Sequence, residues 1–108
     1  MRSNDQYIYV LRPARIEMLV DGGTEEEQAH VADHFSYLKG LTERGTAILM
    51  GRTQETVEET IGIVIFKASS QEEARDFMEE DPAVKNGVMG AKIFRFKIAL
   101  FNPEGVDA

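Results

Sequence analysis

The stretch DHFSYLKGLTERG, residues 33–45, places a histidine on the apolar side of an expected helix. At 100° per residue one face of this helix collects an apolar stripe, made of Val31, Phe35, Leu38 and Leu41. His34 falls inside that stripe, beside Leu38 and Leu41. A titratable ring on a core-facing stripe needs a hydrogen-bonding partner, because burying it without one costs free energy. The stretch therefore predicts a helix that carries a candidate site residue.

The start and the end of this helix have their own signals. Thr24 followed by Glu27 has the spacing of a capping box, and the acidic first turn suits the positive end of the helix dipole. Gly45 is a typical stop, so we expect a helix over 25–44. The preceding segment ARIEMLVDGG, residues 14–23, is expected to be a connecting loop.

The remaining segments predict four strands and a second helix. The strands are expected at YIYVL (7–11), TAILMGR (46–52), TIGIVIFKA (60–68) and AKIFRFKIAL (91–100). A second capping box, Ser70 with Glu73, opens a helix that Pro82 ends. The order β-α-β-β-α-β predicts the α+β class and a ferredoxin-like fold, a four-stranded antiparallel sheet with two helices on one face. We expect a single domain over residues 1–108 with an ordered core at about 7–100.

The second face of this sheet predicts a homodimer. The run IGIVIF is apolar on both alternating faces, with Ile61, Ile63 and Ile65 on one side and Val64 and Phe66 on the other. A monomer would expose one of these sets at a cost of about 1.5 to 3 kcal/mol for each side chain. We therefore expect two sheets to meet face to face.

Composition excludes several classes of partner. Acidic residues outnumber basic residues 19 to 12, which gives a formal net charge of -7. This balance argues against nucleic acid and against an anionic membrane surface as partners. The chain has no cysteine, and no apolar run has the length of a signal peptide or a membrane span. We expect a cytoplasmic protein.

The two histidines offer a weak metal motif. His30 and His34 are four residues apart, and Glu26 lies four residues before His30 on the same side of the helix. Helical histidine pairs at this spacing are common by chance, so we expect no metal site.

His34 has a better candidate partner in Asp81. Glu79, Glu80 and Asp81 crowd the C-terminal end of the second helix, where the helix dipole disfavours negative charge. Asp81 could accept a hydrogen bond from one ring nitrogen of His34 and so orient it for general acid-base catalysis. Alternatively, Asp81 only caps the turn that begins at Pro82, and His34 is a hydrogen-bonded core residue. The residues alone leave these alternatives open.

Three further side chains are candidate substrate-binding groups. Tyr37 is one turn from His34, Arg52 ends the second strand where it could hold an anion, and Tyr9 lies in the first strand. Each also has an ordinary structural explanation, since tyrosines at such edges usually pack with the hydroxyl in water and a terminal arginine is usually a surface charge.

The ordered segments resemble the YCII-related family over about residues 7–100. The resemblance is carried by YIYVLRP, HFSYLKGLTERG, the strand ending in MGR, GIVIFKASSQEEARDFMEEDPAV and GVMGAKIFRFKIAL. It implies a dimeric α+β barrel whose proposed active site is a His-Asp pair in a cleft, and the matching positions are His34 and Asp81. One departure is Gly51-Arg52, where family members often have Gly-Pro.

The resemblance also implies a function. It favours a cofactor-independent enzyme that uses the His-Asp dyad for acid-base chemistry on a small organic substrate, of lyase, isomerase or dehalogenase-like type. The alternative is a non-catalytic module that binds a small molecule. The sequence encodes neither the substrate nor the direction of the reaction.

Overall fold

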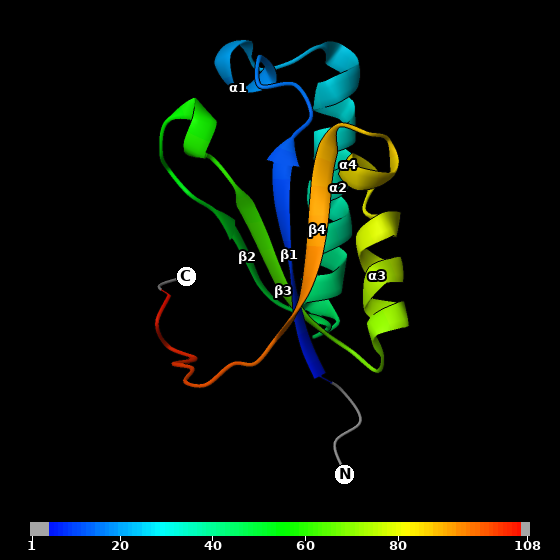
Figure 1. The fold of residues 1–108 in the computed structure, drawn as a ribbon, viewed down its shortest axis with the longest axis vertical. Helices are drawn as coiled ribbons and strands as arrows, with labels where there is room; N and C mark the ends of the chain where they lie inside the picture. Colours follow the sequence, from blue (N-terminus) through cyan, green and yellow to red (C-terminus); the bar gives the residue numbers. More distant parts are fainter. Residues whose placement is uncertain (1–4, 107–108) are drawn as a thin grey trace.

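The computed structural model describes residues 5–106, which form one antiparallel sheet covered by helices (Figure 1). Four strands alternate with helical segments along the chain, and the bounds of the elements are β1 (Asp5–Pro13), α1 (Met18–Asp21), α2 (Glu25–Glu43), β2 (Ala47–Arg52), a 3-10 turn (Val57–Glu59), β3 (Gly62–Ala68), α3 (Gln71–Glu80), α4 (Pro82–Lys85) and β4 (Met89–Phe96). The strands lie in the order β2-β3-β1-β4. The ferredoxin-like α+β fold expected from the sequence is thereby confirmed.

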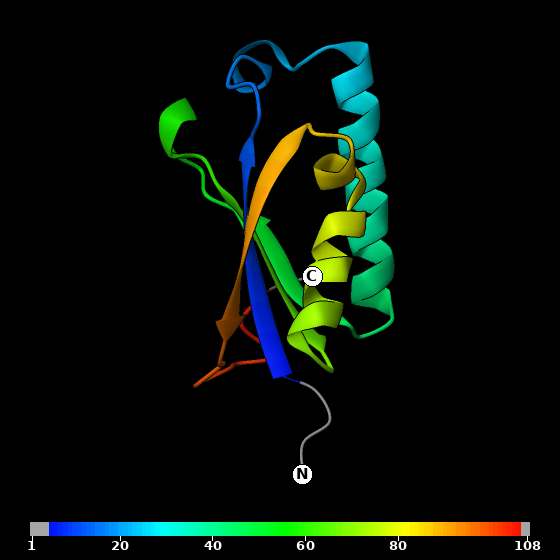
Figure 2. The same cartoon turned by 45° about the vertical axis from the view of Figure 1, so that its right-hand side comes forward.

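The molecule has two layers. In Figure 2, α2, α3 and α4 stand together on one side of the sheet. The core between the layers takes alternate residues of the two central strands and the inner faces of the helices, namely Tyr7, Tyr9, Leu11, Val64, Phe66, Leu38, Leu41, Ala74 and Met78. Phe66 meets the rings of Tyr9 and Phe77 edge to face, at centroid distances of 5.7 and 5.9 Å.

The start of α2 follows the predicted capping box. The Thr24 hydroxyl accepts a hydrogen bond from the Glu27 amide at 3.1 Å, and the Glu27 carboxylate accepts one from the Thr24 amide at 2.8 Å. Arg15 also donates to both Glu27 oxygens, and this pairing is the main reason that the pKa of Glu27 is lowered to about 2. The ion pair ties the segment before α1 to the first turn of α2.

Several local expectations are wrong in detail. The predicted loop at 14–23 contains the short helix α1, which buries Met18 and ends at Gly22 with a φ of 88°. The last strand covers Met89–Phe96, so Ile98 and Leu100 lie outside it, and the first strand already begins at Asp5. Phe35 is 59% exposed instead of being part of the buried stripe, because only its neighbours His34, Leu38 and Leu41 face the sheet.

The second capping box is also incomplete. The Ser70 hydroxyl accepts from the Glu73 amide at 3.0 Å, as predicted. The Glu73 carboxylate, however, accepts from the amide and the hydroxyl of Ser69, one residue before the expected position. The helix therefore still begins at its predicted cap, although the return hydrogen bond goes to the preceding residue.

The face of the sheet away from the helices carries an apolar row. Leu49 pairs with Ile65, Ile65 with Ile8 and Ile8 with Phe94, so the row crosses all four strands. Its two ends are exposed, Leu49 at 40% and Phe94 at 44%. No helix among residues 5–106 is long and apolar enough to cross a membrane.

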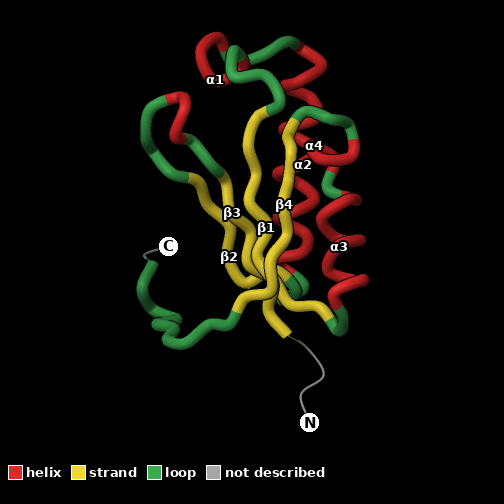
Figure 3. The backbone as a smooth tube through the Cα atoms, viewed as in Figure 1, coloured by secondary structure: helices red, strands yellow, loops and turns green. Residues whose placement is uncertain are grey.

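The two ends of the sheet are occupied by different parts of the chain. The chain enters β1 and leaves β4 at the end opposite α1 (Figure 3). At the other end, α1 and the connection from β2 to β3 gather around the last residues of β1 (Figure 1). The candidate site lies near this second end.

Candidate functional site

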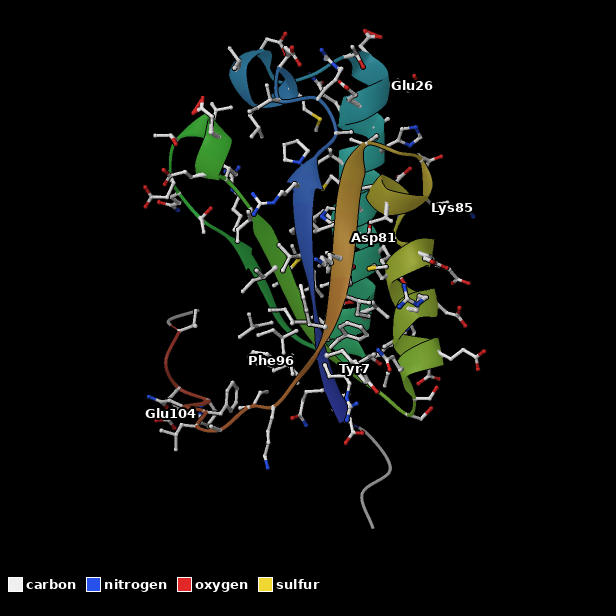
Figure 4. The ribbon with its side chains drawn as sticks, in the orientation of Figure 1. Tyr7, Glu26, Asp81, Lys85, Phe96 and Glu104 are labelled. Atoms are coloured by element: carbon white, nitrogen blue, oxygen red, sulfur yellow. The ribbon has the colours of Figure 1, made fainter. Side chains whose placement is uncertain are left out.

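The two residues singled out by the sequence meet in the interior. His34 Nδ1 lies 2.7 Å from Oδ1 and 2.9 Å from Oδ2 of Asp81, across 47 residues of chain. His34 is 6% exposed and Asp81 is fully buried. Figure 4 shows Asp81 between the sheet and the helices, whereas Glu26 and Lys85 lie at the surface. The hydrogen-bonded pair is therefore present, and its catalytic role stays a prediction.

Asp81 reaches this position because it forms the corner between α3 and α4. It is the C-cap of α3 and the N-cap of α4, and its Oδ1 accepts a hydrogen bond from the Ala83 amide at 3.0 Å. Pro82 follows at the first helical position, which needs no amide hydrogen. The capping alternative and the histidine partner are thus both realised by one side chain.

A third donor completes the surroundings of Asp81. The Tyr9 hydroxyl donates to Oδ2 at 2.7 Å from β1, across 72 residues of chain. An ionised carboxylate accepts hydrogen bonds from His34, Tyr9 and Ala83 at the same time. Because Nδ1 must donate to this carboxylate, the proton of a neutral His34 ring lies on Nδ1 and the free lone pair lies on Nε2.

Nε2 of His34 has access to solvent. No described residue forms a hydrogen bond with it. Every buried side-chain nitrogen or oxygen within residues 5–106 has a hydrogen-bond partner, so the unpaired Nε2 is not a buried atom. His34 also lines a cavity of about 360 Å³. A proton acceptor oriented by a buried carboxylate therefore faces a space large enough for a small organic molecule.

The cavity lies where the strands end under α1 and α2. Its wall is mostly apolar, with Leu11, Met18, Val31, Phe35, Met50 and Met89 among the lining residues. Arg52 and Gly62, neighbours in the β2–β3 ladder, also line it. Gly62 leaves room between Arg52 and Leu11, because it has no side chain at a position that faces the helices.

The predicted substrate-binding residues are placed differently from one another. Arg52 lines the cavity together with His34. Tyr9 and Tyr37 are not among the lining residues: Tyr9 is 1% exposed and bonded to Asp81, and the Tyr37 hydroxyl donates to the Phe77 carbonyl at 2.7 Å. Burial is the main reason that the pKa of Tyr9 is raised far above its usual value and that of Tyr37 to about 12.

Other residues enter the site without having been predicted there. Met50 and Met89 pack against the core and also line the cavity, and the exposed Phe35 lines it too. The sequence could not predict this role, because an apolar residue in a strand or helix has the same pattern whether it lines a cavity or fills the core. Within the described residues no group of three or more histidine, aspartate or glutamate side chains could hold a metal ion, and His30 is half-buried.

The fold and this site define a small α+β protein with a buried His-Asp pair beside an apolar cavity. The YCII-related domain model matches residues 8–97, so the chain belongs to the family of YCII-related domains.

A solved structure is similar in fold. It is the 5-chloro-2-hydroxyhydroquinone dehydrochlorinase (TftG) from Burkholderia phenoliruptrix AC1100, in complex with 2,5-dihydroxybenzoquinone. The two chains share 23% sequence identity with a TM-score of 0.58, over 84% of this chain and 93% of the other. No curated protein matches the sequence.

Proposed function

We propose that the protein is a small acid-base enzyme in which His34 transfers a proton to or from an organic substrate bound in the cavity. The observation that carries this proposal is the position of the His34 ring, which is bonded through Nδ1 to buried Asp81 and lines the cavity. A carboxylate in this position fixes the tautomer and stabilises the imidazolium that forms when Nε2 takes a proton.

The proposed chemistry uses only residues of this chain. Nε2 removes a proton from carbon or oxygen of the substrate, and the resulting imidazolium returns it at another atom in an isomerisation. In an elimination the substrate anion instead expels a leaving group. Dehydrochlorination, the activity for which the similar enzyme is named, is an elimination of this second kind. Both routes need a positioned base and a dry pocket, and neither requires a cofactor.

Arg52 is the proposed contact for a negatively charged substituent. It forms no ion pair with any described residue and lines the same cavity as His34, in a protein whose net charge is -7. A guanidinium at the end of an apolar cavity would hold a carboxylate or phenolate while the body of the substrate packs on the methionines. Small aromatic acids, phenols and hydroxyquinones are therefore the compounds to test first.

Exchange of substrate hydrogen with solvent tests this proposal without knowledge of the full reaction. The protein is incubated in D2O with 2,5-dihydroxybenzoquinone, substituted phenols and unsaturated lactones, and deuterium uptake is followed by proton NMR. The unaltered protein should accelerate exchange for at least one compound, and His34→Gln should reduce that rate by about 10²- to 10⁴-fold. His30→Gln, on the same helix but outside the cavity lining, is the matched control and should keep the rate.

Substitution of Arg52 separates binding from proton transfer in the same assay. Arg52→Gln should raise KM for anionic compounds and leave the rate at saturation nearly unchanged, whereas Arg75→Gln on the exposed side of α3 should change neither. Saturable binding without any exchange or product would instead identify a non-catalytic binding module. Equal exchange by the His34→Gln variant would contradict the proposed base.

We also propose a homodimer formed by the open faces of two sheets. A compact monomer of 12.1 kDa exposes about 6,000 Å². This chain exposes 7512 Å², although part of the excess belongs to the segment that follows β4. The apolar row from Leu49 to Phe94 is the natural centre of such an interface, since a twofold axis would pair it with itself. A cytoplasmic location remains the proposal that goes with a chain lacking cysteine.

A further inference from the structure

Tyr9 makes a polar contact that the proposed function does not use. Its hydroxyl lies 2.7 Å from Asp81 Oδ2, and the residue is 1% exposed in the centre of the core. Phe66 and the neighbouring strands hold the ring, because Tyr9 pairs with Val64 on one side and Ile93 on the other. The hydroxyl therefore has a fixed direction and meets no substrate.

This contact controls the orientation of the carboxylate. Asp81 Oδ1 is already fixed by the Ala83 amide, and His34 Nδ1 lies close to both oxygens, at 2.7 and 2.9 Å. The Tyr9 hydroxyl is the donor that holds Oδ2 from the side of the sheet. Without the Tyr9 hydrogen bond, the Ala83 amide fixes the carboxylate at Oδ1 only. Oδ2 is then free to move, and the angle of the His34 ring is less well fixed.

The tyrosine is also suited to remain a donor. Burial and the adjacent Asp81 charge raise the pKa of its hydroxyl far above the ordinary value, so the proton stays on the oxygen at neutral pH. A phenol that ionised near Asp81 would repel the carboxylate instead of holding it.

We propose that Tyr9 is a positioning residue that acts on His34 through Asp81. The triad Tyr9-Asp81-His34 joins the sheet, the α3–α4 corner and α2 at one carboxylate. This deepens the proposed function, on which its consequence for catalysis rests. The positioning itself can be tested without any substrate.

Tyr37 provides a matched control for the test. It is also a tyrosine in the packed layer, and its hydroxyl donates one hydrogen bond of 2.7 Å, but to the Phe77 carbonyl and not to Asp81. Tyr9→Phe and Tyr37→Phe each remove one oxygen and one hydrogen bond. Their effects on the free energy of unfolding should be similar, while only Tyr9→Phe should alter His34.

The measurement is the NMR spectrum of the two histidine rings in ¹⁵N-labelled protein. In Tyr9→Phe the Nδ1 proton of His34 should exchange with water about tenfold faster and the ring nitrogen shifts should move, because the carboxylate that holds this proton loses one of its donors. Tyr37→Phe should leave both unchanged, and His30 should be unaffected in either variant. Where an exchange substrate has been found, Tyr9→Phe should lower kcat with KM nearly constant.

A double-mutant cycle separates positioning from general loosening of the core. In an Asp81→Asn background, adding Tyr9→Phe should change the His34 signals no further, because the link has already been altered at its centre. If Tyr9→Phe does not fold, 3-fluorotyrosine can be incorporated into the Tyr7→Phe/Tyr37→Phe chain, where position 9 is the remaining tyrosine. The more acidic hydroxyl should then shift the His34 ring signals.

The proposal is overturned if Tyr9→Phe and Tyr37→Phe are indistinguishable in the His34 signals, or if fluorination leaves these signals unchanged. Altered signals in a protein that catalyses no exchange would support the positioning and remove the proposed enzyme. Exchange that depends on His34 but is equally fast in Tyr9→Phe would support the proposed enzyme and overturn the positioning role of Tyr9.

Discussion

A single side chain, Asp81, links the local folding of the α3–α4 corner to the candidate site. Its backbone leaves the helical region, with φ -59° and ψ 123°, and this break ends α3 and lets α4 begin in a new direction. The same change of direction points the carboxylate toward α2 and β1, where it forms hydrogen bonds with His34 and Tyr9. The negative charge of Asp81 at the end of α3 is therefore tolerated because hydrogen-bond donors from three directions stabilise it.

Substitutions of Asp81 should differ strongly in their effect on stability. Asp81→Ala leaves His34, Tyr9 and the Ala83 amide without their acceptor in the interior and removes the N-cap, so the free energy of unfolding should fall by about 3 to 5 kcal/mol. Asp81→Asn keeps one acceptor oxygen and the size of the side chain, and should lose roughly 1 to 2 kcal/mol. Urea denaturation followed by circular dichroism measures both; equal losses would contradict the convergent role of the carboxylate.

Individual site residues differ in how well the sequence predicts them. His34 was recognisable because a polar ring interrupts an apolar stripe, and Asp81 because it breaks the charge preference of a helix end. Tyr9 was noticed as a candidate group, but its partner lies 72 residues away and no periodicity connects a strand to a helical corner. Its position in the core could be inferred from strand alternation, whereas its hydrogen bond depends on how the two layers meet.

At the scale of the elements, the cavity is a product of how β2, β3 and β1 end together. Arg52, Gly62, Leu11 and Ala91 are successive partners across the sheet, and the glycine interrupts this row with an empty position. A Cβ at Gly62 would meet Leu11 at 3.5 Å, which is an ordinary van der Waals contact, so the missing side chain is not required by packing. At Gly62, β3 thus lacks a side chain that would stabilise the strand, and the space that this side chain would fill is part of the cavity.

Filling this position should separate stability from ligand binding. Gly62→Val should raise the free energy of unfolding by about 0.5 to 1 kcal/mol, since glycine is a poor strand residue, while it weakens binding of 2,5-dihydroxybenzoquinone or a better ligand by tenfold or more. Thermal unfolding and NMR titration of the His34 ring measure the two effects. Gly90→Val in β4, where an added Cβ would meet nothing within 4 Å and which lies outside the cavity lining, should keep the affinity. Unchanged binding in Gly62→Val would place the ligand elsewhere.

Elements with a strong periodic or capping signal were predicted well, and short or boundary elements were not. The order of strands and helices along the chain and both long helices follow from alternation, capping spacings and Pro82. The four-residue helix α1 has too few residues for a periodic pattern, and it forms because Met18 can reach the core while Arg15 pairs with Glu27. The end of β4 depends on where its pairing with β1 stops, at Gln6 opposite Phe96, which no signal inside AKIFRFKIAL specifies.

At the scale of the whole molecule, the apolar row on the open face of the sheet has exposed ends at Leu49 and Phe94, and the proposed assembly can be tested directly. Sedimentation velocity at micromolar concentration should give twice the mass of the chain. Leu49→Lys combined with Phe94→Lys should give a folded monomer, because both side chains are exposed in the single chain and lie at the two ends of the apolar row. Leu100→Lys, equally apolar and 95% exposed but outside the sheet, is the control and should leave the dimer intact. A parent protein that sediments as a monomer would end this proposal.

The origins of the three hydrogen-bonded side chains also bear on how the protein is made in the cell. Tyr9 comes from the first strand, His34 from the middle of the long helix and Asp81 from a corner that is synthesised late. A ribosome-bound chain that has emerged only through β3 already carries Tyr9 and His34, yet it has no carboxylate to join them. Incomplete translation products that end before Asp81 therefore cannot display the oriented imidazole, which forms only in a nearly full-length, closed chain.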